Sequence, residues 1–195
     1  MAFTPIALPD ADVRLDPDWL PTSDADALFM ALRGDIAWEV HRIRLFGRLV
    51  DSPRLSCWIG DPDAAYAYSG TRFEPHPWPA ALLPVRARLA RETGVDFNSV
   101  LANCYRDGRD YMGWHSDNER ALGQRPVIAS LSLGQTRRFV FRQRSAKNAK
   151  QDLLLPNGAL LLMAGDAQSL YQHALPATAK PVGARINLTF RRIVG

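Results

Sequence analysis

The segment 185–191 constrains the fold of this chain most strongly, because its side chains alternate strictly in character. Ile186, Leu188 and Phe190 are apolar, whereas the positions between and beside them are polar: Arg185, Asn187, Thr189 and Arg191. Successive side chains of a β-strand point to opposite sides, so this pattern predicts a strand with one face in a core. The other face either meets solvent or lines a pocket for an anion, and the strand alone does not decide between the two.

Further strand-like segments dominate the second half of the chain. Strands are expected within residues 36–46, 53–61, 127–134, 137–143, 152–155, 159–163 and 184–193. The Asn157-Gly158 pair lies between two apolar runs and predicts a β-hairpin at that point. With helices in the first half, this order favours an antiparallel sandwich or small barrel with an α/β extension in front.

Two helices are predicted in that extension. The first covers residues 22–33, with Thr22 or the serine after it as the N-cap and Gly34 as the stop. The second covers residues 84–93, and Gly94 is expected to end it.

The composition is that of a single globular domain. The chain has 195 residues, of which 47% are hydrophobic and 23% charged. No apolar run approaches the ~18 residues that a membrane span needs, and the first residues do not resemble a secretion leader. Cys57 and Cys104 are the only cysteines and show neither a disulfide nor a metal pattern, so we expect a reducing, cytoplasmic location.

Arginine dominates the basic residues. Of 24 basic residues three are lysines, which leaves 21 arginines in a chain of net charge +4. Arginine forks match the oxygens of phosphate and carboxylate groups. The clusters at residues 42–48 and 137–150 are therefore either solvated faces or contacts to nucleic acid.

A second polar strand face is predicted at residues 101–105. Asn103 and Tyr105 are two positions apart and share a face, although both could be ordinary polar groups ahead of the Asp107-Gly108 turn. If they converge with the polar face of segment 185–191, the resulting cavity suits a small dicarboxylate.

The sequence GWHSDNE at residues 113–119 contains candidate metal ligands. His115 and Asp117 are two positions apart, but such a pair is a weak signal without a third ligand. His173 is the best third ligand, and two histidines with one carboxylate form the facial triad typical of non-haem Fe(II). The remaining histidines are expected to be structural: His41 and His76.

Other chemistries fit less well. Zinc hydrolases also use two histidines and a carboxylate, but they need no arginine-lined dicarboxylate pocket. The GxSxG motif of serine hydrolases is absent, and so are the Walker and GxGxxG phosphate loops.

Taken together, these residues resemble the AlkB-like family of Fe(II)/2-oxoglutarate-dependent dioxygenases, in its DNA demethylase branch nearest the double-strand repair homologues. The similarity runs from about Arg44 to Ile193, through NCYRDGRDYMGWHSDNE, PVIASLSLGQTRRFVFR, QHALP and ARINLTFRRI. It implies a mostly β chain with an α/β N-terminal extension and a double-stranded β-helix (jelly-roll) core. Within the single domain 1–195, it implies an extension with nucleotide-recognition hairpins at 1–95 and a catalytic core at 96–195.

The resemblance also implies roles for individual residues. Fe(II) would be held by His115, Asp117 and His173. The cosubstrate 2-oxoglutarate would be held by Asn103, Tyr105, Arg185, Asn187, Thr189 and Arg191, with Arg185 on its distal carboxylate and Arg191 near its keto-acid end. The damaged base would contact Tyr66, Tyr68, Ser69, Asn118 and Glu119, where Asn118 replaces an aspartate of the relatives.

A wedge for double-stranded DNA is implied at the RLFGR segment. Leu45, Phe46 and Gly47 would enter the duplex where the base is extruded, and apolar wedges of this kind unstack bases. The alternative is that Leu45 and Phe46 belong to a sheet core. Arg54 and the segment 137–150 are candidate contacts to the DNA backbone.

The implied function is direct-reversal repair of alkylated DNA. The enzyme would oxidatively demethylate 1-methyladenine and 3-methylcytosine with Fe(II), O2 and 2-oxoglutarate, releasing formaldehyde, succinate and CO2. Its partner would be alkylated DNA, with RNA as an alternative, and we expect a monomer that does not bind membranes. Two other functions stay open: a 2-oxoglutarate oxygenase acting on RNA or a protein side chain, and a catalytically silent nucleic-acid-binding protein.

Overall fold

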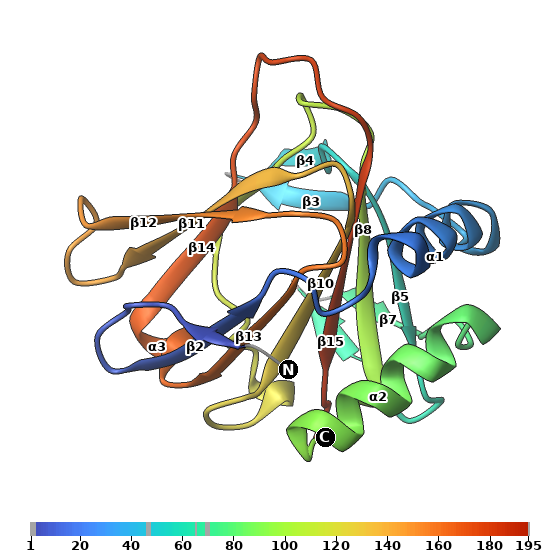
Figure 1. Ribbon diagram of the computed structural model, residues 1–195, viewed down its shortest axis with the longest axis horizontal. Coiled ribbons are helices and arrows are strands. Elements are labelled where there is room, and N and C mark those ends of the chain that lie inside the picture. The colour runs from blue at the N-terminus through green and yellow to red at the C-terminus, as the bar shows by residue number, and fades with distance from the viewer. Residues whose placement is uncertain (1–2, 46–47, 65, 69–70, 195) are drawn as a thin grey trace.

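The chain forms two antiparallel β-sheets that face each other (Figure 1). The computed structural model describes residues 3–45, 48–64, 66–68 and 71–194. The larger sheet, called here the major sheet, has the order β1-β2-β13-β10-β15-β8-β5, and the minor sheet has the order β12-β11-β14-β9. This arrangement confirms the mostly β, jelly-roll class that the sequence predicted.

The strand bounds follow the order of each sheet. The major sheet contains β1 (Thr4–Pro5), β2 (Ala11–Asp16), β13 (Leu160–Gly165), β10 (Ile128–Gly134), β15 (Arg185–Arg191), β8 (Ser99–Tyr105) and β5 (Leu55–Gly60). The minor sheet contains β12 (Lys150–Leu155), β11 (Arg137–Gln143), β14 (Tyr171–Leu175) and β9 (Met112–His115). Two hairpins form two-stranded sheets of their own: β3 (Arg42–Leu45) with β4 (Arg48–Asp51), and β6 (Tyr66–Tyr68) with β7 (Thr71–Phe73).

The two longer helices cover one face of the major sheet. The helices are α1 (Thr22–Asp35), α2 (Leu83–Thr93) and the short α3 (Ala167–Leu170), with 3-10 turns η1 (Ala80–Leu82) and η2 (Arg120–Leu122). Leu28 and Leu32 of α1 and Leu89 of α2 pack in one cluster with Leu188 and Phe190 of β15. The helices thus cover the apolar face of the strand and leave its polar face to the space between the sheets. None of the helices in the described part of the chain is long and apolar enough to cross a membrane.

The helix predictions held for α2 and needed correction for α1. Gly94 follows α2 with φ of 72°, the left-handed conformation that glycine adopts most readily. In α1, however, Pro21 occupies the N-cap position, and no side chain caps the helix. The predicted stop was also wrong, since Gly34 lies inside the helix, which ends at Asp35.

The Asn157-Gly158 turn does not form the predicted hairpin. β12 pairs with β11 in the minor sheet, whereas β13 pairs with β10 and β2 in the major sheet. The turn therefore carries the chain from one sheet to the other. Gly158 has φ of +84°, and an added Cβ would stand 2.2 Å from the carbonyl oxygen of Leu20, so this position needs glycine for space as well as for conformation.

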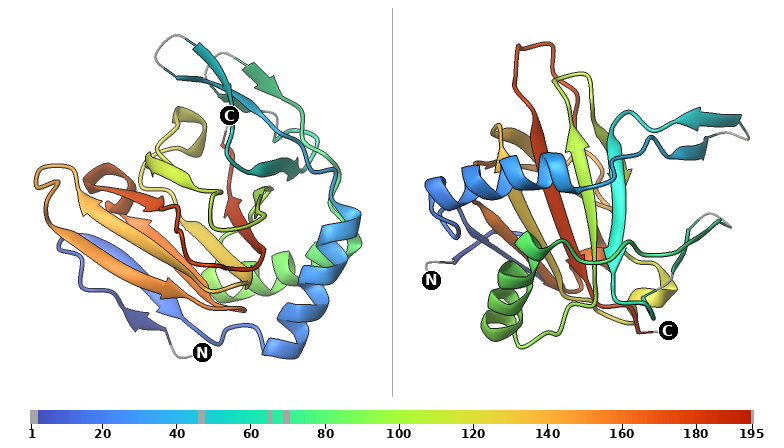
Figure 2. Two further views of the ribbon diagram at one scale, coloured as in Figure 1. Left: turned by 90° about the horizontal axis from the view of Figure 1, so that it is seen from above. Right: turned by 90° about the vertical axis from the view of Figure 1, so that its right-hand side faces the viewer.

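Strands from both halves of the chain build the major sheet. β2, which the sequence pattern did not predict, pairs with β13, and β5 pairs with β8. Within the described residues of segment 36–46, the strand covers Arg42–Leu45. The division into residues 1–95 and 96–195 stays a prediction, and the sheet includes strands from both sides of it. The β3–β4 and β6–β7 hairpins extend outward from this body (Figure 2).

Candidate metal and 2-oxoglutarate site

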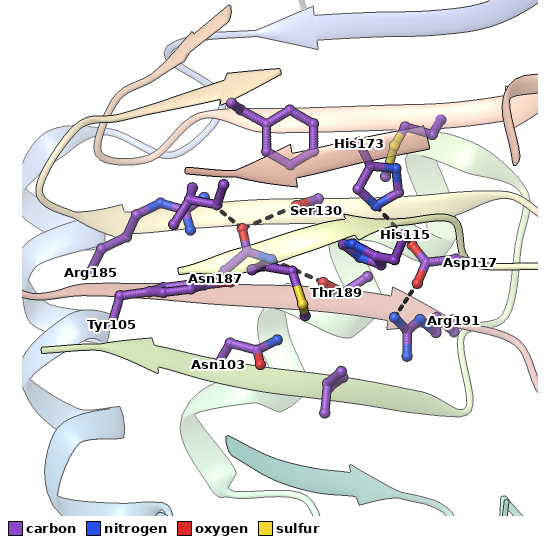
Figure 3. Close-up of a pocket in the computed structure, with 15 residues that line it drawn as sticks. Asn103, Tyr105, His115, Asp117, Ser130, His173, Arg185, Asn187, Thr189 and Arg191 are labelled. Atoms are coloured by element: carbon purple, nitrogen blue, oxygen red, sulfur yellow. Dashed lines mark hydrogen bonds and ion pairs between the residues drawn. The ribbon is translucent and has the colours of Figure 1, made fainter. Parts of the chain in front are cut away.

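A cavity opens between the polar face of the major sheet and the inner face of the minor sheet. Strands β8, β10 and β15 supply its polar lining, and β9 and β14 supply its two histidines (Figure 3). The lining residues are Leu101, Asn103, Tyr105, Met112, His115, Asp117, Ser130, Phe139, Met163, His173, Leu175, Arg185, Asn187, Thr189 and Arg191. Every residue predicted to hold iron or 2-oxoglutarate is among them.

Sheet register explains why these residues meet. Across the β15–β8 ladder Arg185 lies opposite Tyr105, and Asn187 lies opposite Asn103. All seven residues of β15 are buried, so the strand has a core on one face and the cavity on the other. The solvent-facing alternative for its polar face is therefore excluded, and the pocket prediction is confirmed.

The three candidate metal ligands converge at one end of the cavity. His173 of β14 lies opposite His115 of β9, and Asp117 follows two residues after β9. Their ligand atoms all lie within 4.8 Å of one another, and His173 Nε2 is 3.6 Å from an Asp117 carboxylate oxygen. His115 Nδ1 lies 2.8 Å from the carbonyl oxygen of Gly113, to which it donates, and this leaves Nε2 as the ligand atom.

The protonation states at this end suit metal binding. Burial lowers the pKa of His173 to about 3 and lowers that of His115 as well, so both imidazoles are neutral at physiological pH. Burial alone would raise the pKa of Asp117, but Arg191 and the two histidines outweigh it, and the pKa of this carboxyl falls below its usual range. Two neutral imidazoles and one carboxylate form the required donor set.

Hydrogen bonds join the His115–Asp117 segment to the segment that leads into His173. The Asp117 backbone N–H donates to Gln168 Oε1 at 2.8 Å, and Ser116 Oγ donates to the Tyr171 carbonyl oxygen at 2.6 Å. Sequence reasoning did not identify Gln168, which lies in the short helix α3 and is buried. These contacts fix the backbone of both ligand segments relative to each other.

The opposite end of the cavity is built around Arg185. One of its terminal nitrogens, Nη2, donates to Ser132 Oγ at 2.8 Å and to Asn187 Oδ1 at 2.7 Å, and the guanidinium lies over the Tyr105 ring at 5.4 Å. Its Nε is buried and has no hydrogen-bond partner within the described residues. Burial lowers the pKa of Arg185 to about 10, which still leaves it charged at neutral pH. A buried cation with an unused donor is suited to an incoming carboxylate.

Arg191 lies at the metal end rather than beside Arg185. It is ion-paired with Asp117, and both side chains are buried. This position agrees with the predicted place near the keto-acid end of 2-oxoglutarate, since that end must approach the metal. Between the two arginines, Asn187 Nδ2 donates to Thr189 Oγ1 at 2.9 Å, so hydrogen bonds connect Arg185, Asn187 and Thr189 along the polar face of β15.

The predicted base contacts are only partly described. Phe46, Gly47 and Ser69 lie outside the described residues, and the backbones of Leu45, Tyr66 and Tyr68 lie in the two projecting hairpins. Asn118 is exposed and Glu119 is half-buried, both directly after Asp117. Their roles toward a base stay predictions.

Two arginines predicted as DNA backbone contacts have other partners. Arg54 Nε donates to Asn103 Oδ1 at 2.7 Å, which places Arg54 beside the cavity, and its contact with DNA stays a prediction. Arg137 is buried and donates to three backbone carbonyl oxygens, so it is not available for a DNA contact and that interpretation was wrong. The strand pattern could not reveal this, because its burial depends on loops far away in the sequence.

The site fits Fe(II), which the facial triad suggests, and it fits 2-oxoglutarate, which the buried arginine suggests. The donor set and its protonation fit Fe(II), and the unused Nε of buried Arg185 fits a carboxylate of 2-oxoglutarate. The two ends share one cavity, so a ligand could bridge them.

Comparison with known proteins supports this assignment. The model of the 2OG-Fe(II) oxygenase superfamily matches residues 12–191. The alpha-ketoglutarate-dependent dioxygenase alkB homolog 3 of Bos taurus is 36% identical over 190 residues, which cover 93% of this chain and 66% of the relative. The DNA oxidative demethylase ALKBH2 is 36% identical in Bos taurus, with 88% of this chain and 66% of the relative covered, and 35% identical in Homo sapiens, with 88% and 70% covered.

A solved structure described as "The structure of OsALKBH1" has the same fold, with a TM-score of 0.66, 15% identity and coverage of 98% of this chain and 100% of that chain. The chain spans 66% of the length of the two bovine relatives. A family model that covers nearly the whole chain, relatives above 30% identity and a triad in the expected cavity agree with one another. The chain belongs to the AlkB-like family within the 2OG-Fe(II) oxygenase superfamily.

Proposed function

We propose that this protein oxidatively demethylates N-alkylated bases in DNA, with 1-methyladenine and 3-methylcytosine as substrates. One observation carries the proposal: a single cavity joins an iron-type triad to an arginine with a free donor. The sequence of this chain is 36% identical to a protein named as a DNA oxidative demethylase, which supports DNA as the substrate class.

Iron and 2-oxoglutarate, when bound, supply the oxidation by O2 of the N-methyl group, after which formaldehyde is lost and the base is restored. The protein's residues would orient the reactants. Arg185, Tyr105 and Asn187 would hold the distal carboxylate, and the neutral His115 and His173 with ionised Asp117 would hold the metal. All of these groups except the half-buried His115 are buried, which limits the access of bulk water to the reacting atoms.

The substrate base would approach from the side of the two projecting hairpins. Bases inside a duplex are inaccessible to such a cavity, so the damaged nucleotide must be extruded. We place Tyr66, Tyr68 and Ser69 beside the extruded base, Asn118 and Glu119 at its edge, and Leu45, Phe46 and Gly47 in the gap that it leaves. Ring methylation makes these bases cationic, so tyrosine faces and a glutamate would favour them over undamaged bases.

Formaldehyde release from methylated oligonucleotides tests the proposal. The protein would be loaded with Fe(II) and 2-oxoglutarate and given 1-methyladenine or 3-methylcytosine in single-stranded DNA, duplex DNA and RNA. Release of formaldehyde with restoration of the base in DNA is expected. Turnover of RNA alone would move the substrate to RNA, and tight binding without turnover would favour the silent binding protein.

We also propose that the protein works in the cytoplasm as a monomer. Cys57 and Cys104 are both free thiols, as expected in a reducing compartment. Cell fractionation tests the location, and light scattering on the purified protein tests the oligomeric state.

A further inference from the structure

The dicarboxylate end of the cavity contains a second buried arginine that does not line it. Arg137 begins β11, and its side chain is 3% exposed. Gly134 lies opposite Arg185 in the β10–β15 ladder, and only the two residues 135 and 136 separate β10 from Arg137. The backbones of the two arginines are therefore close although they belong to different sheets, and the positive charge of Arg137 reaches Arg185, whose pKa it lowers.

The hydrogen bonds of Arg137 go entirely to backbone carbonyls of two loops. Nη1 donates to the Asp107 oxygen at 3.0 Å, and Nη2 donates to the oxygens of Asp110 and Pro176 at 3.0 and 2.9 Å. One loop joins β8 to β9, and the other begins the connection from β14 to β15. These four strands carry both histidine ligands of the metal and most of the polar lining, so Arg137 fixes the end of the cavity.

The charge of Arg137 is not neutralised by an ion pair. The charges of the Asp110 and Asp107 carboxylates reach Arg137 from a distance, but each carboxylate is ion-paired with another arginine, Asp110 with Arg106 at 2.8 Å and Asp107 with Arg109 at 2.7 Å. Within the described part of the chain, no carboxylate forms an ion pair with Arg137 or Arg185. Two buried positive charges that have no ion-pair partner of their own among the described residues are costly, and an arriving dicarboxylate would relieve this cost.

We propose that Arg137 is a positioning residue for the cosubstrate, whose buried charge makes the site selective for a keto acid with a second carboxylate. The inference rests on the use of 2-oxoglutarate proposed above. Arg185 lines the cavity and would contact the distal carboxylate directly. Arg137 does not line the cavity, so it would act through the electrostatic field of its charge and through the loops that it holds.

The test compares two keto acids that differ only in the distal carboxylate, namely 2-oxoglutarate and 2-oxopentanoate. Each would be titrated anaerobically into the Fe(II)-loaded protein, and the visible absorption of the complex would give the two dissociation constants. Arg137→Gln removes the charge, whereas Arg137→Lys keeps the charge but loses the fork. Arg138→Gln is the matched control, since Arg138 is exposed on the opposite face and pairs with Asp152.

In Arg137→Gln, the binding of 2-oxoglutarate is expected to weaken about tenfold more than the binding of 2-oxopentanoate. This is the size of effect expected when one charge is removed from a partly buried site. Arg137→Lys and Arg138→Gln should retain the selectivity of the wild-type protein. An equal weakening of both keto acids in Arg137→Gln would mean that Arg137 only holds the loops, and the proposal would be overturned. If Arg137→Gln does not fold, a loss of selectivity in Arg137→Lys would overturn it equally.

No nucleic acid enters this measurement. A wild-type protein that binds 2-oxoglutarate but demethylates no DNA would overturn the proposed substrate and leave the Arg137 inference standing. A wild-type protein that binds no 2-oxoglutarate would overturn both.

Discussion

Arg185 and Arg191 lie on the same face of the same strand, six positions apart, and both are buried in one cavity. Arg191 has its counter-ion within the protein, in the carboxylate of Asp117. Among the residues that the structure describes, Arg185 donates to neutral acceptors, and its Nε has no hydrogen-bond partner. The metal end of the cavity therefore has a counter-ion for its arginine within the protein, whereas the dicarboxylate end must take its counter-ion from a ligand.

This difference shows how one strand can build two kinds of site. At the metal end, Arg191 lowers the pKa of Asp117 and keeps the carboxylate available as a ligand even without a bound group. At the other end, the uncompensated charge of Arg185 needs an anion from outside the protein. The comparison predicts that substitutions at the two ends have separable effects on metal and cosubstrate binding.

The largest effect is expected at the metal end. Asp117→Ala removes one of three ligands and the partner of Arg191, so Fe(II)-dependent decarboxylation of 2-oxoglutarate should fall by more than about a hundredfold. His115→Ala should act in the same way. Asp152→Ala is the control, because this carboxylate pairs with Arg138 on the exposed face of the minor sheet. Decarboxylation retained by Asp117→Ala would contradict the metal assignment.

A smaller but selective effect is expected at the dicarboxylate end. Arg185→Met removes a charge-assisted pair of about 2–3 kcal/mol, so the 2-oxoglutarate affinity should fall on the order of a hundredfold. Metal affinity, measured by calorimetry with Mn(II), should hardly change. Arg192→Met is the control, since Arg192 is half-exposed just beyond the end of β15. Equal losses of metal and cosubstrate would mean that the two ends do not act separately.

A substitution outside the cavity should change neither metal binding nor 2-oxoglutarate binding. Phe46→Ala is expected to slow repair of duplex DNA by about tenfold while single-stranded DNA is affected much less, because only the duplex needs a wedge. Decarboxylation without DNA should be unchanged. Equal losses on both DNA forms would argue that Phe46 belongs to the structure of the hairpin rather than to a wedge.

The smallest effect concerns pH, and only the metal end should show it. The folded protein without metal holds His173 at a pKa of about 3, below the value of 6.5 for an exposed histidine. Below pH 6.5 the unfolded chain therefore takes up a proton that the folded chain refuses, and the free energy of unfolding falls by up to about 1.4 kcal/mol per pH unit. Urea unfolding between pH 7 and 5 measures this slope.

His173→Gln should flatten that slope, because it removes the buried imidazole that stays neutral in the folded protein. Arg185→Met should leave the slope unchanged, since an arginine does not titrate in this range. A slope that is the same in His173→Gln and in the wild-type protein would contradict the assignment.

The residues that line the cavity were predictable because their signal is local. A two-residue period identifies which side chains of a strand share a face, and this suffices for Arg185, Asn187, Asn103 and Tyr105. The triad needed His173 as a third residue far away in the sequence, and the choice among the remaining histidines depended on the position of the arginine strand.

What the sequence did not reveal depends on long-range contacts. The pattern around Asn157-Gly158 predicts a turn but not the sheets that it joins. The burial of Arg137 depends on carbonyl groups 27 to 39 residues away. Gln168 carries no recognisable motif, and its contact with the Asp117 backbone becomes visible only when α3 is placed beside the segment that follows β9.

β15 lies between β10 and β8 in the major sheet, although it follows both of them in the chain. During synthesis β8 and β10 must therefore leave the ribosome with facing edges unpaired, and exposed edges of this kind invite association with other chains. The strand that carries both arginines also closes that gap. Nascent chains that stop before residue 185 should thus depend on chaperones, and neither end of the cavity can bind its ligand until the strand is in place.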